Sequence, residues 1–279
     1  MNAPAASPLS SPTAVQRQPA LFLSHGSPML AVEEDAATAA WGRIGRALPR
    51  PRAVVVASAH WLTRAPAVGA APLPVTVHDF GGFPEALYQV RYPAPGAPEI
   101  AQSVAGRLRA AGLEASLDPS RGLDHGIWVV LQRLFPAADV PVVPLALQPH
   151  LGAAHHYRLG AALAPLRDEG ILILGSGGFV HNLREYFEGL YRDGEPAHVR
   201  AFRLWMRERL EAGDVEALLD YRRQAPDAVR AHPTDEHLLP LYVALGAAGG
   251  EPVQSLYDGV ADGVLGMDAF AFAAEPLAV

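Results

Sequence analysis

Cysteine is absent from this 279-residue chain. Its absence excludes disulfides, thiolate catalysis, iron–sulfur clusters and cysteine-based zinc sites. Lysine is absent as well, so all 22 basic residues are arginine. A chain without lysine cannot form the Schiff base of a pyridoxal phosphate enzyme, and it cannot supply the lysine of a P-loop. Polar chemistry must come from other residue types, and the sequence offers eleven histidines.

Excess positive charge and long apolar runs are also missing. The formal net charge is −7, whereas a general binder of nucleic acid or of an anionic membrane is usually basic. No apolar run reaches the roughly 18 residues that a membrane span needs. We therefore expect no nucleic-acid partner, no membrane partner and a cytoplasmic location.

The composition is that of a globular protein. Half of the residues are hydrophobic and 18% are charged, which is too apolar for an intrinsically disordered chain. Residues 1–18 are rich in Ala, Pro and Ser and lack the basic start and apolar core of a secretory signal, so they predict a disordered tail. Residues 19–279 show neither a repeat nor an internal linker, and we expect one domain there.

Short apolar runs alternate with helical patterns along this domain. Runs such as the Val-rich residues 53–60 are typical of strands buried on both faces of a parallel sheet. The alternation predicts an α/β fold with a central, mostly parallel or mixed sheet flanked by helices. The expected strands are 20–25, 53–60, 74–80, 140–147, 170–176, 251–257 and 266–273. The expected helices are 34–48, 98–111, 151–167, 197–220 and 238–250.

Four histidines fall at the ends of these elements. His25, His60 and His181 follow expected strands, and His237 stands at the start of an expected helix. Because α/β sheets bind ligands at the carboxyl ends of their strands, these residues can converge on one crevice. Distant imidazoles without cysteine favour an open catalytic site for a divalent transition metal over a closed structural zinc site. The alternative is that each histidine makes only a local hydrogen bond.

The other histidines divide into two groups. His78 opens a long loop rich in Gly, Pro and aromatic residues, which can line a pocket with Phe80, Phe83, Tyr88 and Tyr92 or merely pack down. His125 comes just before an expected helix that Asp124 can cap; it either faces the crevice or makes a helix-start hydrogen bond. For the remaining five we expect solvent-facing positions: His150, His155, His156, His198 and His232.

The glycine-rich segment 175–178 follows a strand, where a phosphate-binding turn is often found. It lacks the GxGxxG pattern and a P-loop lysine, so a nucleotide site is disfavoured. Ser176 is not a nucleophile elbow either, because Leu174 stands where GxSxG requires glycine. We expect these glycines to let the backbone pass close to a metal and a substrate.

Taken together, the histidine-bearing segments carry a family resemblance. In chain order they are LSHGSP, SAHW, HDFGGFPEALYQVRYPAPG, GLDHGIW, GSGGFVHNL and DEHLLPL. From about residue 20 to about residue 272 the chain resembles the class III (LigB-like) extradiol ring-cleavage dioxygenases, and most of all their DOPA-dioxygenase subgroup. FGGFPEALYQVRYPAPG is the most specific of these segments.

The resemblance implies a single α/β domain that opens the ring of a DOPA-like catechol with dioxygen and yields a semialdehyde. It implies Fe(II) for activity, with Zn(II) as another bound metal. Apart from the resemblance, we expect a monomer or homodimer. Its motifs place metal ligands at His25, His60 and His237, with Glu236 as the alternative to His237. His181 matches an acid–base residue that also approaches the metal as a fourth ligand. His125 matches a second active-site histidine, and His78, Phe80 and Tyr88 are the expected substrate-binding residues.

Two other function classes remain open at this stage. A zinc-dependent hydrolase would use the same histidines to activate water, with His181 or Glu236 as base. A non-catalytic protein would bind metal or ligand without turnover. A dioxygenase differs from both because it consumes dioxygen.

Overall fold

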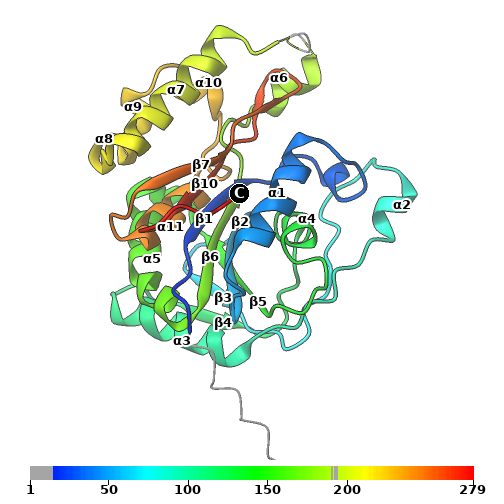
Figure 1. The fold of residues 1–279 in the computed structure, drawn as a ribbon, viewed down its shortest axis with the longest axis vertical. Helices are drawn as coiled ribbons and strands as arrows, with labels where there is room; N and C mark the ends of the chain where they lie inside the picture. The colour runs from blue at the N-terminus through cyan, green and yellow to red at the C-terminus, as the bar shows by residue number, and fades with distance from the viewer. Residues whose placement is uncertain (1–14, 190, 192–193) are drawn as a thin grey trace, which may run out of the picture.

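The central feature of the computed structural model, which describes residues 15–189, 191 and 194–279, is a mixed sheet (Figure 1). Its strand order is β4-β3-β5-β2-β6-β1-β10-β7, and a two-stranded sheet pairs β8 with β9. The strands are β1 (Ala20–Ser24), β2 (Ala53–Leu62), β3 (Ala67–Gly69), β4 (Ser116–Asp118), β5 (Val142–Leu147), β6 (Ile171–Gly177), β7 (Val253–Tyr257), β8 (Val260–Ala261), β9 (Leu265–Gly266) and β10 (Ala269–Phe272).

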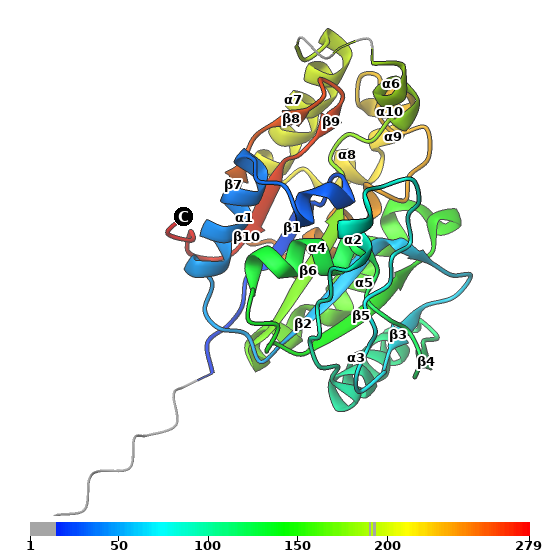
Figure 2. The same cartoon turned by 90° about the vertical axis from the view of Figure 1, so that its right-hand side faces the viewer.

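Helices cover both faces of this sheet, as the two orthogonal views show (Figures 1 and 2). The α-helices are α1 (Ala36–Ala47), α2 (Glu85–Tyr88), α3 (Pro98–Ala110), α4 (His125–Leu134), α5 (Gly152–Leu163), α6 (Leu183–Glu188), α7 (Ala197–Ala212), α8 (Val215–Leu219), α9 (Tyr221–Gln224), α10 (Ala228–Ala231) and α11 (Leu239–Ala248). Three short 3₁₀ helices are η1 (Pro28–Ala31), η2 (Pro149–Leu151) and η3 (Ala164–Glu169).

Parallel pairing joins the middle of the sheet. β2 is parallel to both β5 and β6, and β6 is parallel to β1. The sheet becomes mixed toward its edges, where β10 pairs antiparallel with β1 and β7, and β3 pairs antiparallel with β5. The predicted α/β class with a mixed central sheet is therefore confirmed.

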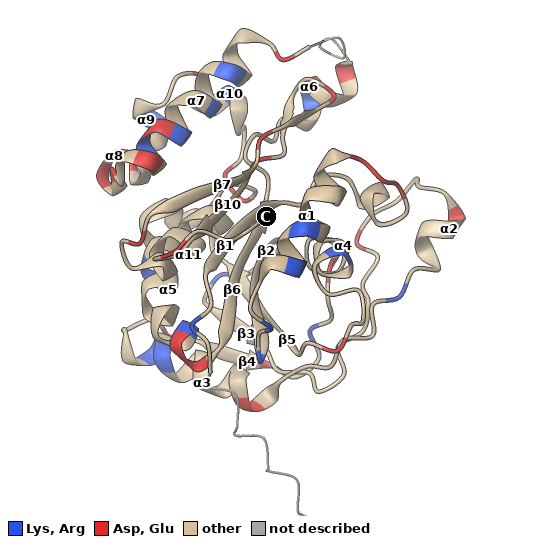
Figure 3. Cartoon of the chain, in the orientation of Figure 1, with Lys and Arg blue, Asp and Glu red and all other residues tan. Residues whose placement is uncertain are grey.

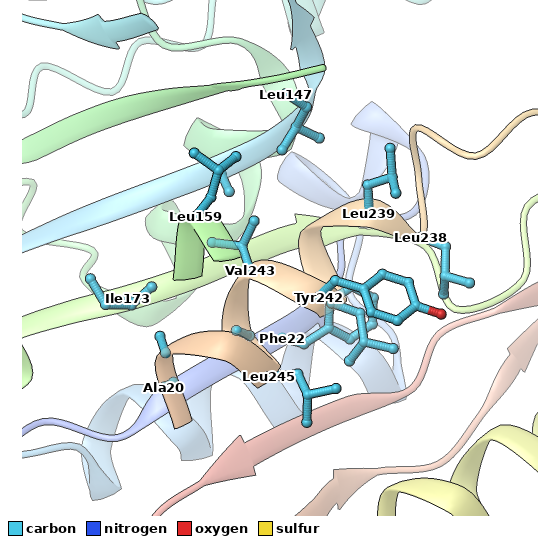
Figure 4. Packing of buried hydrophobic residues seen from close by; sticks show 14 of the residues in the cluster. Ala20, Phe22, Leu147, Leu159, Ile173, Leu238, Leu239, Tyr242, Val243 and Leu245 are labelled. Carbon is cyan, nitrogen blue, oxygen red and sulfur yellow. The ribbon is translucent and has the colours of Figure 1, made fainter. Parts of the chain in front are cut away.

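The core has two layers because side chains alternate along each buried strand. On β1, Leu21 and Leu23 pack into the cluster that contains α1 and α4. The intervening Phe22 packs on the opposite face, against Tyr242 and Val243 of α11 (Figure 4). Charged side chains lie mainly on the surrounding helices and loops and hardly at all on the central strands (Figure 3).

The sequence located most of the strands but not all of the connections. Residues 74–80 do not form the predicted strand; they run as an irregular segment with one bridge between Thr76 and Leu123. The predicted helix 197–220 is interrupted at Gly213, whose left-handed φ of +65° ends α7. The short strands β3 and β4 were not anticipated.

The N-terminal tail prediction falls largely outside the described residues, since these begin at residue 15. The last part of the predicted tail belongs to the domain. Gln18 is buried, and its backbone N–H donates to the carbonyl of Arg167 at 3.0 Å. Arg17 pairs with Asp168 and Glu251. The packed chain thus begins before residue 19.

Helices α5 and α11 pack through two glycines. A Cβ on Gly160 would lie 2.0 Å from the carbonyl oxygen of Val243, and a Cβ on Gly246 would lie 2.0 Å from that of Tyr157. The two backbones can approach this closely only because neither position carries a side chain.

We predict that Gly160→Ala lowers the free energy of unfolding by about 1–3 kcal/mol, because the added methyl forces the helices apart. Gly106→Ala on α3 is the matched control, since nothing lies within 4 Å of its Cβ position; alanine there should stabilise the helix by roughly 0.5–1 kcal/mol. Denaturant unfolding followed by circular dichroism measures both. Equal stability of the two variants would contradict the packing argument.

Candidate active site

Three neighbouring strands deliver histidines to one edge of the sheet. In the order β2-β6-β1 all three strands run parallel, so their carboxyl ends lie together. His60 lies near the end of β2, His25 directly follows β1, and the loop after β6 leads to His181. The convergence expected from the sequence is therefore what the fold produces.

His237 reaches the same place through a close backbone contact. A Cβ on Gly177 would lie 2.0 Å from the carbonyl oxygen of His237, and one on Gly175 would lie 2.1 Å from that of Pro240. The N–H of Gly178 donates to the His237 carbonyl at 2.8 Å. The glycines of segment 175–178 thus let the chain leading into α11 lie directly against the end of β6.

The rings of His25, His60 and His237 surround a common point. One ring nitrogen from each lies within 4.8 Å of the others, and the Nε2 atoms of His25 and His60 are 2.9 Å apart. The ring centroid of His237 is 5.4 Å from that of His25 and 5.0 Å from that of His60. This spacing allows three imidazoles to hold one ion.

A separate partner faces the Nδ1 atom of each ring. Nδ1 of His25 lies 3.1 Å from Oγ of Ser176, which itself donates to the carbonyl of Gly126. Because that hydroxyl hydrogen is already engaged, the oxygen accepts from His25, and its ring keeps the hydrogen on Nδ1. The lone pair on Nε2 then points to the common point.

Carboxylates take the corresponding place beside the other two rings. Nδ1 of His237 donates to Oε1 of Glu236 at 3.0 Å, and Nδ1 of His60 lies 3.6 Å from Oδ2 of Asp79. Both contacts direct Nε2 to the common point. Glu236 also accepts from the hydroxyl of Thr234. This geometry favours His237 over Glu236 as the residue that faces an ion.

The histidine cluster is uncharged at neutral pH. Burial is the main cause: it lowers the pKa of His25 and His237 well below the ordinary value, and proximity of the other histidines lowers both further. Burial and the neighbouring His125 lower the pKa of His60 to about 3. Neutral imidazole is the form that ligates metal, so the donor set fits a divalent transition ion.

His181 stacks on His237 with the ring centroids 3.5 Å apart and the planes 8° apart. Its backbone N–H donates to the carbonyl of Ala231, which holds the loop after β6 in place. Burial lowers the pKa of His181 to about 4. At neutral pH its ring is therefore uncharged and able to accept a proton.

Sequence reasoning missed Asp79, which lies beside two of the histidines. Its Oδ1 accepts from the backbone N–H of His125 at 2.9 Å and from Nδ1 of the same ring at 3.0 Å. Although burial acts to raise it, these hydrogen bonds lower the pKa of Asp79 to about 2. The only signal was its position in the HDF segment, next to residues already singled out.

His125 is the first residue of α4 rather than the residue before it, and the side chain of Asp124, at the N-cap position, makes no capping hydrogen bond. The carboxylate of Asp124 instead accepts from the hydroxyl of Ser58 at 2.6 Å and pairs with Arg121. Burial raises the pKa of Asp124. Asp79 rather than Asp124 receives the N–H of His125 at the helix start.

A pocket of about 440 Å³ opens above the histidine cluster, within the roughly 300–1,000 Å³ typical of small-molecule sites. It is lined by His25, His60, His125, His181, His237 and Phe80, among others. His78 and Tyr88 are not among its described lining residues. Nε2 of His78 instead donates to the carbonyl of Val90, and the rings of His78 and Tyr88 both pack against Phe80.

Three histidines expected at the surface are buried. His156 accepts from the backbone N–H of Gln148 at 3.0 Å, and His198 pairs with Glu185. His232 is fully buried, with Nε2 donating to the carbonyl of Phe179. The sequence pointed to solvent because His198 and His232 stand in polar stretches and His156 lies in an expected helix; their hydrogen-bond partners are visible only in the fold.

None of the helices in the described ranges combines the length and the apolar character that crossing a bilayer requires.

Comparison with known proteins gives consistent matches. Residues 19–264 match the family described as "Catalytic LigB subunit of aromatic ring-opening dioxygenase". The chain is 44% identical over 257 residues to a "4,5-DOPA dioxygenase extradiol" of Escherichia coli K12, covering 90% of this chain and 93% of the relative. It is 41% identical over 246 residues to a protein of the same name from Beta vulgaris, covering 85% and 91%.

A solved structure of an uncharacterized protein from Escherichia coli K12 has the same fold. It superposes with a TM-score of 0.77 at 36% identity and covers 92% of this chain and 100% of that one. The family match and the relatives span nearly the whole described domain, including every histidine of the cluster. The chain therefore belongs to the LigB family of aromatic ring-opening dioxygenases.

Proposed function

We propose that this protein opens the aromatic ring of a catechol at an extradiol bond, consumes dioxygen and releases a ring-opened semialdehyde. The observation that carries the proposal is the convergence of three uncharged histidines at the buried end of a pocket, in a chain of the ring-opening family. The relatives named 4,5-DOPA dioxygenase make DOPA-like catechols the first candidates.

We assign metal binding to Nε2 of His25, His60 and His237, and we assign His181, whose ring stacks on that of His237, as a further ligand when substrate is absent. Three neutral imidazoles suit Fe(II), which we expect for activity, and also Zn(II) as an alternative bound metal. Bound Fe(II) would supply a redox-active Lewis acid that favours loss of the catechol protons and allows reaction with dioxygen. Ser176, Asp79 and Glu236 would keep the three rings oriented.

We assign proton transfer to His181. Its neutral ring lines the pocket beside His237, so it can take a proton from a catechol hydroxyl and return it when the ring opens. His125 faces the pocket from another side. Because Asp79 engages its Nδ1, the nitrogen available to a substrate oxygen is Nε2. Phe80 lines the same pocket and would contact the substrate ring.

A zinc-dependent hydrolase is not supported. The matched family and the relatives described above are ring-opening dioxygenases, and no feature of the described pocket favours hydrolysis over ring cleavage. The cytoplasmic location and the choice between monomer and homodimer stay predictions from the sequence.

The test of this function is oxygen uptake. Protein loaded anaerobically with Fe(II) should consume dioxygen when a catechol is added and form a yellow product, because ring opening gives a conjugated semialdehyde. Protein loaded with Zn(II) should not consume dioxygen. Turnover that proceeds equally well without air would contradict the proposal.

We predict that His25→Ala and His60→Ala each lose the bound metal together with the activity, because two imidazoles hold an ion much more weakly than three. His150→Ala, at an exposed position outside the described lining of the pocket, is the control and should retain both. Metal analysis after gel filtration measures occupancy. Full occupancy in both ligand variants would refute the assignment.

We predict that His181→Ala keeps its metal but lowers kcat by about 10²- to 10⁴-fold, the usual contribution of an acid–base group. Circular dichroism and metal content should match the unchanged protein, since the three assigned ligands remain. Turnover like that of the unchanged protein would remove His181 from the mechanism.

A further inference from the structure

Besides its histidines, the pocket has an apolar lining, part of which is exposed to solvent. Its side chains come from three separate segments: Phe80, Phe83, Leu183, Phe187, Leu265 and Met267. We call these six residues the outer wall. Two of them are unusually open to solvent, because Phe187 is 77% exposed and Leu183 is 44% exposed. An apolar ligand group that covers this exposed apolar area removes it from water, which lowers the free energy of the complex.

Helix α6 carries Leu183 and Phe187, the two exposed residues of the outer wall. Asn182 caps the helix by accepting from the N–H of Glu185 at 3.2 Å, and Gly189 ends it. The charged residues of α6 are paired with each other or with neighbouring helices: Arg184 pairs with Glu188 at 3.0 Å, and Glu185 pairs with His198 and Arg230. The apolar side chains Leu183 and Phe187 are left to line the pocket.

The described residues of the pocket lining include no lysine or arginine. Lysine is absent from the whole chain, and none of the described residues that line the pocket is an arginine. The carboxylates near the histidine cluster are those of Asp79 and Glu236, which would repel a further negative charge. A substrate carboxylate against the outer wall would find no cationic partner among the described lining residues, and any hydration that it lost there would not be replaced.

Building on the proposed function, we propose that the substituent of the catechol lies against the outer wall and that the preferred substrates carry a neutral, apolar substituent. The two hydroxyls would face His25, His60 and His237, which directs the rest of the molecule toward Phe187 and Leu183. Catechols whose side chain ends in a carboxylate, DOPA among them, are poorer substrates of this chain.

The experiment compares catechols of similar length with the Fe(II)-loaded protein. We expect kcat/KM for 4-propylcatechol to exceed that for 3-(3,4-dihydroxyphenyl)propanoate and that for DOPA by about tenfold or more, since a propyl group covers apolar area that a hydrated carboxylate leaves uncovered. Equal values, or higher values for either acid, would overturn the inference while leaving ring cleavage intact. Failure to open any of the three would overturn the proposed function and this inference with it.

A variant tests the wall itself. Phe187→Arg places a cation at an exposed position, so it should fold normally, raise kcat/KM for the propanoate and lower it for 4-propylcatechol. Leu204→Arg on α7 is the matched control, since Leu204 is also exposed, at 52%, and is not among the described lining residues. A ratio of the two kcat/KM values that changes equally in both variants, or in neither, would overturn the placement of the substituent.

Discussion

The site depends on one backbone contact, the approach of the chain at His237 to the end of β6. Three of the converging histidines come from neighbouring strands and would meet in any parallel arrangement of β2, β6 and β1. His237 comes from a distant part of the chain and reaches them only because Gly175 and Gly177 leave no side chain between the two backbones. The hydrogen bond from Gly178 to the His237 carbonyl then fixes the distance. The position of the His237 ring therefore depends on glycine at residues 175 and 177.

Around that contact, the protein gives each ring a different partner. A hydroxyl, an aspartate and a glutamate face the Nδ1 atoms of His25, His60 and His237. The two carboxylates supply negative charge close to three imidazoles that carry none of their own. A divalent ion at the common point would be balanced by charges on the far side of the His60 and His237 rings.

The sequence predicted the parts of the fold that have a local signal. Val-rich runs located β2, β5 and β6, and histidines at the ends of strands pointed to one edge of the sheet. Asp79 had no such signal, because its partners His60 and His125 are brought to it only by the folded loop. Polar and apolar residues alternate along residues 74–80 as in a strand. In the described structure this segment forms a single β-bridge, between Thr76 and Leu123, so it is no strand of the sheet. His156 and His232 are buried although histidine is polar, because each hydrogen-bonds to a backbone group, of Gln148 and of Phe179. The sequence gives no sign of these contacts.

Ser176 links the ring of His25 to the start of helix α4. Its hydroxyl oxygen contacts His25, and its hydrogen is donated to the carbonyl of Gly126 in the first turn of α4, which begins at His125. A shift of α4 that reoriented His125 would pull on the same hydroxyl that steadies His25. The position of the His25 ring and the position of the first turn of α4 are thus coupled through a single hydroxyl, so a substitution at Ser176 would act on both.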